Sequence, residues 1–148
     1  MPLIYVAGRF RGPTAWDIEE NVRFAERFGL FVAKLGAMPV IPHANTRYFQ
    51  GQMDDQFWID GTLQLLNACH GAIFIPDWRN SVGARGEWDA TPKERRFDLG
   101  QLVTDRQGTI VEANLKTDKE IARLRKFIGA FREACRAAAT DRAGRIAD

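Results

Sequence analysis

A chain of 148 residues has the length of one domain, and its apolar and charged fractions of 45% and 27% are ordinary for a soluble globular protein. The net charge of +2 gives no reason to expect nucleic acid or an anionic membrane as a partner. No apolar run approaches the roughly 20 residues that a membrane span needs, and the N-terminus lacks the basic start of a secretion signal. We therefore expect a cytoplasmic protein without a membrane partner.

Three short apolar runs predict buried strands, at residues 2–8, 37–43 and 71–76. A helical pattern follows each of them. The first begins at Thr14, which with Asp17 fits a capping box. The second begins at Asp54 or Asp55, and the third at Ser81. Strands that alternate with helices predict an α/β protein with a parallel sheet and right-handed crossovers.

The pattern weakens beyond Ala90. Two short strands are expected near Gln101–Thr104 and Thr109–Glu112, with a hairpin as one arrangement. A final helix is expected over about residues 117–139, and residues 140–148 are expected to fray. Residues 1–139 are thus predicted to form a single domain.

All three predicted strands end in loops rich in polar residues, at positions 8–12, 43–50 and 77–87. In parallel sheets, ligands bind outside the carboxyl ends of the strands, near a switch in strand order. We therefore expect the three loops to contribute to one shared site.

The third loop carries a Ser-x-Gly-x-x-x-Glu pattern formed by Ser81, Gly83 and Glu87. If Ser81 caps a helix, Gly83 and Glu87 share one face of it. Glycine lets a ligand approach the backbone, and the free amides of a helix N-terminus suit a phosphate. A carboxylate beside the anomeric carbon of a sugar acts as a nucleophile or stabilises an oxocarbenium-like transition state. The alternative is a capped surface helix with one exposed glutamate.

Other candidate residues lie on all three loops and on the elements beside them. The loop of residues 8–12 offers backbone amides with Arg9 or Arg11 for a phosphate, although a plain strand–helix connection is an equal alternative. A buried Tyr5 hydroxyl needs a partner, for which a carboxylate is suited. Asp60 lies inside a helix, where aspartate is unfavourable unless it is simply exposed. His43 could touch a ligand or be a polar loop residue.

Several kinds of site are excluded. There is no zinc or calcium spacing, no P-loop lysine, no nucleophile elbow and no Cys–His nucleophile pair. Cys69 and Cys135 lie far apart in apolar or helical settings, so we expect reduced thiols without a disulfide. What remains is carboxylate chemistry that needs no metal and no cofactor.

Three segments and the helix that contains Asp60 occur in an order that resembles the nucleoside 2-deoxyribosyltransferase superfamily: "IYVAGRFRG", "MPVIPH" and "WRNSVGARGEWDA". The chain is most similar to the branch of 2'-deoxynucleoside 5'-monophosphate N-glycosidases and to a group of uncharacterised relatives (DUF4406). The resemblance covers roughly residues 3–90. The chain differs from the family pattern at His70, where an aspartate is common, and at Thr91-Pro92, which shortens the helix of the glutamate.

The resemblance implies roles for individual residues. Glu87 would be the nucleophile at C1', Tyr5 would hold Glu87, and Asp60 would assist the base or the sugar. The first loop and the Ser/Gly pair would bind a 5'-phosphate. The complete candidate substrate-binding set is Gly8, Arg9, Phe10, Arg11, Gly12, His43, Asp77, Trp78, Ser81 and Gly83.

The resemblance also implies a flavodoxin-like (Rossmann-like) three-layer α/β/α fold, with a parallel sheet of about five strands. The expected activity is cleavage or transfer at the N-glycosidic bond of a nucleoside or nucleoside 5'-monophosphate, in a homo-oligomer that is a dimer or larger. The alternatives are a nucleotide-binding sensor without catalysis, a phosphoribohydrolase of the lysine-decarboxylase-like group, whose PGGxGTxxE run is missing here, and a protein-interaction domain that uses the basic C-terminal helix.

Overall fold

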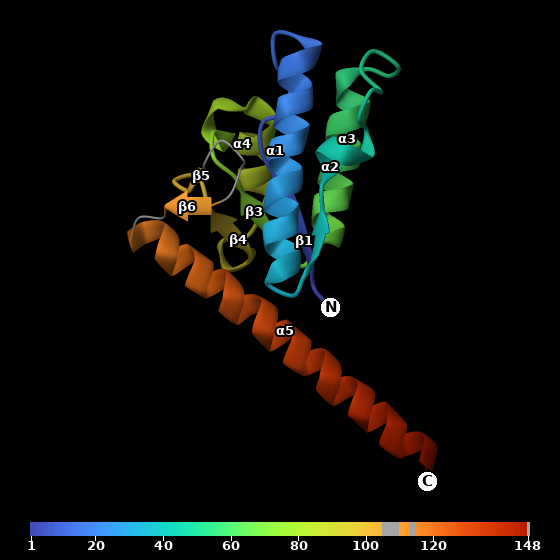
Figure 1. Cartoon of the computed structure of the whole chain (residues 1–148). Helices are drawn as coiled ribbons and strands as arrows, with labels where there is room; N and C mark the ends of the chain where they lie inside the picture. Colours follow the sequence, from blue (N-terminus) through green and yellow to red (C-terminus); the bar gives the residue numbers. More distant parts are fainter. Residues whose placement is uncertain (105–109, 113–114, 148) are drawn as a thin grey trace.

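The computed structural model describes residues 1–104, 110–112 and 115–147 (Figure 1). Its main sheet has four parallel strands in the order β2-β1-β3-β4. These strands are β1 (Leu3–Ala7), β2 (Met38–Val40), β3 (Gly71–Phe74) and β4 (Arg96–Asp98). This is the order of the first four strands in doubly wound sheets of the 2-1-3-4-5 type, and its switch point lies between β1 and β3.

In the described ranges, five α-helices and two short 3-10 helices connect and cover these strands. They are α1 (Ala15–Lys34), α2 (Pro42–Asn45), α3 (Asp55–Ala68), α4 (Val82–Ala90), α5 (Leu115–Ala147), η1 (Trp78–Asn80) and η2 (Lys93–Arg95). The predicted caps are confirmed: Thr14 and Asp17 form a capping box, Asp54 caps α3 and Ser81 caps α4. After α1 the chain turns at Gly36, whose φ of +96° favours glycine.

Helices pack against both faces of the sheet. Alternate side chains of β1 point to opposite faces, so neighbouring residues join separate apolar cores. On one face, Ile4 shares a core with Phe28 of α1 and Leu124 of α5. On the other face, Tyr5 shares a core with Leu66 of α3 and with Ala84 of α4. The α/β class with a parallel sheet is therefore confirmed.

The fourth strand is where the sheet differs from the sequence-based expectation. β4 lies in a charged segment for which the pattern predicts no strand, yet Phe97 at its centre is 0% exposed. The two predicted short strands exist as β5 (Val103–Thr104) and β6 (Ile110–Glu112), but they pair antiparallel in a separate sheet. The expected turn between them falls outside the described residues. The main sheet thus has four strands in the described part of the chain, and a fifth is not confirmed.

The last helix is longer than expected. α5 begins at Leu115 and continues through Ala147, past the predicted end at residue 139 and through residues expected to fray. Residues 132–145 are all exposed, and Figure 1 shows this half of the helix projecting away from the sheet. Cys135, on that half, and the buried Cys69 are both free thiols. Across the described ranges, the helices include none with the length and apolar character to cross a membrane.

Replacing Phe97 by alanine should test the assignment of β4 to the core. The substitution removes a fully buried ring that packs edge-on against Phe127, so the free energy of unfolding should fall by about 3–5 kcal/mol. Urea unfolding measures this loss. Phe49→Ala is the matched control, since Phe49 is 49% exposed and should lose at most about 1 kcal/mol. Equal losses in the two variants would place Phe97 outside the core.

Candidate functional site

The loops that follow the strands meet at the carboxyl edge of the sheet. The loop after β1 contacts the segment after β2 through His43, whose Nε2 lies 3.1 Å from the carbonyl oxygen of Gly8. It contacts the loop after β3 through an ion pair of 3.3 Å between Arg9 Nη1 and Asp77 Oδ2. The expectation that the three loops come together is therefore confirmed for these residues.

A third contact joins the first loop to the start of α3. Arg11 Nη2 lies 2.6 Å from Asp55 Oδ1, and both side chains are largely exposed. The Arg11 guanidinium, through its hydrogen bond and its charge, lowers the pKa of the Asp55 carboxyl. Exposed pairs of this kind contribute little stability, so Arg11 can exchange Asp55 for another anion at little cost. Figure 1 shows that α1 and α3 begin at the same end of the molecule.

The centre of the candidate site is a hydrogen bond between β1 and α4. The fully buried Tyr5 donates its hydroxyl proton to Glu87 Oε1 over 2.6 Å. The carboxylate partner expected for Tyr5 is thus present, and it is the glutamate of the Ser-x-Gly-x-x-x-Glu pattern. Among the described residues, Glu87 has no ion pair and its carboxylate accepts no other hydrogen bond. One carboxylate oxygen is therefore left for a ligand.

The surroundings of Glu87 favour its neutral form. Burial raises the pKa of this carboxyl to about 7, although the hydrogen bond from Tyr5 acts in the opposite direction. Burial and the nearby Glu87 raise the pKa of Tyr5, so the phenol stays protonated and remains a donor. A glutamate whose pKa lies near neutrality, in a partly buried position, is typical of a catalytic acid, base or nucleophile.

Thr62 of α3 completes the surroundings of the Tyr5 hydroxyl, and no pattern in the sequence pointed to it. The nearby Thr62 side chain lowers the pKa of Tyr5 against the larger effect of burial. The Thr62 hydroxyl also donates to the carbonyl oxygen of Ile59 over 3.0 Å. Asp60, the predicted catalytic residue of the same helix, is exposed and accepts a hydrogen bond of 2.7 Å from Gln56. The structure therefore brings Thr62, and not Asp60, to Tyr5.

A cavity lies beside Thr62, between α2 and α3. It has a volume of about 420 Å³, and its lining combines apolar and polar side chains, including Pro42, Asn45, Phe57, Trp58, Thr62 and Leu65. This volume lies within the range of small-molecule sites. Thr62 both lines the cavity and lies beside Tyr5. The cavity is therefore next to the hydrogen bond between Tyr5 and Glu87.

The first turn of α4 combines a side-chain cap with exposed backbone. The Ser81 side chain accepts a hydrogen bond of 3.3 Å from the amide of Ala84 and so caps the helix. Val82 and Gly83, which follow, are exposed, and a Cβ on Gly83 would meet only Ser81 Oγ, at 3.9 Å. Packing within the protein therefore does not require glycine at position 83. Open backbone at a helix N-terminus can accept a phosphate.

The two glycines of the first loop have a different explanation. A Cβ on Gly8 would lie 2.6 Å from Ile75 Cγ1, and a Cβ on Gly12 would lie 2.4 Å from Asp17 Cβ. Both glycines are therefore required by packing inside the fold, whatever binds nearby. Phe10, between them, is half-buried and lies with its ring centroid 5.9 Å from that of His43.

His43 is more buried than a polar loop residue would be, at 5% exposure. Burial lowers the pKa of its imidazole, so the neutral form is favoured. Nε2 faces the carbonyl oxygen of Gly8, while Nδ1 has no hydrogen-bond partner among the described residues. The structure thus places His43 inside the junction between the first two loops.

Asp77 and Trp78 stand where β3 ends, and each has a partner inside the protein. Asp77 has a φ of +71°, in the left-handed region, which is uncommon for a residue with a side chain. Besides Arg9, its carboxylate accepts a hydrogen bond from Asn80. Trp78 is 4% exposed and stacks on Trp88 with ring centroids 4.6 Å apart. Its indole ring is therefore part of the core under the loop.

No cluster of three or more His, Cys, Asp and Glu side chains suited to a metal ion occurs in the part of the chain that the structure describes. The candidate chemistry of the site thus rests on Glu87, with Tyr5 as its hydrogen-bond donor.

Fold and site together define a parallel α/β protein with a candidate small-ligand site at the carboxyl edge of its sheet. The chain belongs to the family described as a domain of unknown function (DUF7768), whose model matches residues 2–97. The matched part runs from β1 into β4 and contains Tyr5, Ser81 and Glu87. No curated protein and no solved structure matches the chain.

Glu87→Gln should stabilise the protein at alkaline pH. The folded state holds this carboxyl at a pKa of about 7, above its ordinary value of 4.5, so wild-type stability falls as the pH rises from 4.5 through 7. Glutamine does not ionise, and its carbonyl can still accept from Tyr5. The variant should therefore match the wild type near pH 4.5 and exceed it by about 1–3 kcal/mol at pH 8.

Urea unfolding at several pH values checks this difference. Glu20→Gln is the matched control, because Glu20 is an exposed residue of α1 and should show no such dependence. A Glu87→Gln protein that is no more stable than the wild type at pH 8 would contradict the raised pKa.

Proposed function

We propose that the protein cleaves, or transfers a group at, the N-glycosidic bond of a nucleoside or nucleoside 5'-monophosphate, with Glu87 as the nucleophile. The observation that carries this proposal is the 2.6 Å hydrogen bond from Tyr5 to a half-buried Glu87 that has no ion pair among the described residues. This contact occupies one carboxylate oxygen and leaves the other for a ligand. The resemblance to the nucleoside 2-deoxyribosyltransferase superfamily supplies the substrate class.

In the proposed step, the free oxygen of ionised Glu87 forms a bond to C1' of the sugar. The bond from C1' to the base nitrogen breaks, its electron pair stays on the base, and the base takes up a proton from solvent. A water molecule then attacks C1', loses a proton and releases the carboxylate. A second base in place of water would make the reaction a transfer. Neither route needs a cofactor or a metal ion.

The phosphate of a nucleotide would bind between the first loop and the start of α4. The exposed backbone after Ser81 supports this placement, as do Arg9 and Arg11 across the rim. Both arginines already pair with carboxylates, Arg9 with Asp77 and Arg11 with Asp55. Because these pairs are exposed, a phosphate can replace the carboxylates at little cost. The cavity beside Thr62 is of a suitable size and lining for the base.

The proposal also covers the fold type and the oligomeric state. Four strands in the order β2-β1-β3-β4 with helices on both faces support a flavodoxin-like, Rossmann-like assignment. We also propose a homo-oligomer in the cytoplasm, and the oligomer is based on the resemblance to the nucleoside 2-deoxyribosyltransferase superfamily.

A nucleotide-binding sensor is the second candidate, and the position of Asp60 favours it. The resemblance to the nucleoside 2-deoxyribosyltransferase superfamily implies that this carboxylate assists the reaction. Here it is exposed and accepts a hydrogen bond from Gln56 on its own helix. Calorimetry with a panel of nucleotides, followed by chromatography for free base, separates the two functions. Binding without release of base would support the sensor.

Replacing Glu87 should abolish base release. Purified protein is incubated with a panel of 2'-deoxynucleosides and their 5'-monophosphates, and free base is measured by chromatography. Without a nucleophile, Glu87→Ala and Glu87→Gln should lose activity by a factor on the order of 10³ or more. Glu20→Gln, an exposed change of the same chemistry on α1, should retain the wild-type rate. Folded Glu87 variants with full activity would refute the nucleophile assignment.

The pH dependence of kcat/KM should report the ionisation of Glu87. The carboxylate must be ionised to attack, so kcat/KM should rise with pH, reach half its maximum near pH 7 and level off about one unit higher. A nucleoside substrate is used, because it has no phosphate that titrates in this range. Tyr5→Phe removes the hydrogen bond that lowers this pKa, so its acid limb should move to higher pH. A limb that stays in place would show that another group controls the profile.

A further inference from the structure

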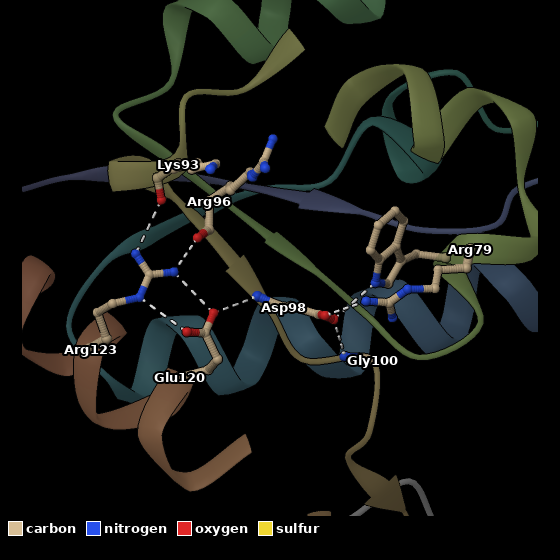
Figure 2. Close-up of polar contacts among 8 residues, drawn as sticks. Arg79, Lys93, Arg96, Asp98, Gly100, Glu120 and Arg123 are labelled. Atoms are coloured by element: carbon tan, nitrogen blue, oxygen red, sulfur yellow. Dashed lines mark hydrogen bonds and ion pairs between the residues drawn. The ribbon is translucent and has the colours of Figure 1, made fainter. Parts of the chain in front are cut away.

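Asp98, at the carboxyl end of β4, holds the segment that leads into α4. Its Oδ1 accepts hydrogen bonds from Trp78 Nε1 at 3.0 Å and from the amide of Gly100 at 2.9 Å (Figure 2). Its Oδ2 accepts one from Arg79 Nη2 at 2.6 Å. The Arg79 guanidinium also lies 4.4 Å from the centroid of the Trp78 ring. One carboxylate therefore fixes two consecutive residues of η1.

Gly100 lies close to the side chains of Asp98, Arg79 and Trp78. A Cβ at position 100 would lie 2.9 Å from Asp98 Oδ1 and 3.1 Å from both Arg79 Nη1 and Trp78 Nε1. Any side chain there would have to displace the carboxylate or the two groups that it binds. Burial raises the pKa of Asp98, but the hydrogen bonds from Trp78, Arg79 and Gly100 outweigh burial and keep it low. The residue therefore stays ionised at neutral pH.

Asp98 is itself held from the other side by α5. Its amide donates to Glu120 Oε2 over 2.9 Å, and Arg123 Nη2 lies 3.0 Å from the same oxygen (Figure 2). Arg123 also donates to the backbone carbonyl oxygens of Arg96 and Lys93, which precede Asp98 on the chain. Side chains of α5 thus hold the backbone of Asp98 and of the residues before it, and the Asp98 carboxylate projects from this fixed backbone.

The position of η1 determines the start of α4. Ser81, the cap of α4, follows η1 directly, and the carbonyl oxygen of Arg79 accepts a hydrogen bond of 2.7 Å from Arg85 Nη1. Trp88 of α4 stacks on Trp78 of η1, but the body of α4 also has contacts that do not involve η1. Glu87 accepts a hydrogen bond from Tyr5, and Arg96 Nη1 donates to the carbonyl oxygens of Trp88 and Thr91 at 2.8 and 3.1 Å. A change at η1 should therefore displace the first turn of α4 more than it displaces Glu87.

We infer that Asp98 is a positioning residue for the anion site: it fixes Trp78 and Arg79, and through them the open amides that follow Ser81. The inference rests on the proposed function, because it takes the phosphate of a nucleoside monophosphate as the group that those amides bind. Asp98 also pairs with Arg79 through a carboxylate that is itself mostly buried, so this guanidinium, although exposed, stays on Asp98 and does not compete for the phosphate.

Steady-state kinetics with a matched pair of substrates tests the inference. Asp98→Ala and Asp98→Asn are compared with the wild type on a 2'-deoxynucleoside and on its 5'-monophosphate. KM for the monophosphate should rise about tenfold in Asp98→Ala and less in Asp98→Asn, which can still accept from Trp78. The kinetics of the nucleoside should change less than about twofold. Asp89→Asn is the control, since Asp89 is an exposed residue of α4 with no ion pair or side-chain hydrogen bond to any residue that the structure describes, and it should match the wild type on both substrates.

A merely structural role gives a different result. If Asp98 only stabilises the fold, kcat per total protein falls equally for both substrates and KM does not change, which overturns the inference. An unchanged or lowered KM for the monophosphate also overturns it, the latter because a freed Arg79 would then bind the phosphate better. If Asp98→Ala does not fold, Gly100→Ala displaces the carboxylate by a smaller change and should show the same selective rise in KM.

The two proposals fail in distinguishable ways. If the wild type releases no base, the proposed reaction is wrong, and calorimetry with the monophosphate replaces kinetics: a tenfold weaker Kd in Asp98→Ala supports the positioning role, and an equal Kd overturns it. If the wild type is active and the Asp98 variants have the wild-type KM for the monophosphate, only the positioning role is overturned. A wild type that neither cleaves nor binds the monophosphate overturns both.

Discussion

The hydrogen bond from Tyr5 to Glu87 joins the first strand to the fourth helix, and the candidate site depends on it. A carboxylate taken out of water needs a donor, because its desolvation is otherwise strongly unfavourable. Tyr5 supplies that donor from within the sheet, so its hydroxyl fixes both where α4 lies and which oxygen of Glu87 remains open. The same contact moderates the rise in the pKa of Glu87 that burial produces. Position and protonation of the glutamate are thus set together.

The strand order explains why polar groups from distant parts of the chain gather beside this pair. β1 lies between β2 and β3, so the chain leaves it towards one side and later returns on the other. His43 on one side and Asp77 on the other both contact the loop after β1, at Gly8 and Arg9. β4 then extends the sheet and supplies Asp98 beneath the third loop. The segment after β2 thus contributes a buried imidazole, the loop after β3 contributes an ion pair, and the end of β4 contributes the carboxylate that binds Trp78 and Arg79.

Much of this arrangement could be predicted from sequence, because apolar runs and helix caps are local signals. Thr14 and the Ser81 cap are examples. β4 could not, since Arg96–Asp98 contains one apolar residue. Its charged side chains have partners from distant parts of the chain: the Asp98 carboxylate binds Trp78 and Arg79, and the Arg96 guanidinium lies 4.1 Å from the centroid of the Trp88 ring. The same limit applies to α3. Asp60 and Thr62 are two positions apart on one helix, and only packing against the sheet decides that Thr62 faces Tyr5.

The projecting half of α5 has a practical consequence. A helix of 33 residues is about 50 Å long, and Figure 1 shows its final turns at the opposite end of the molecule from the start of α1 and α3. A fluorophore or an immobilising tether attached to the last turns of α5 would therefore leave the rim of the sheet unobstructed. This geometry makes that part of α5 a suitable attachment point for surface-based measurements.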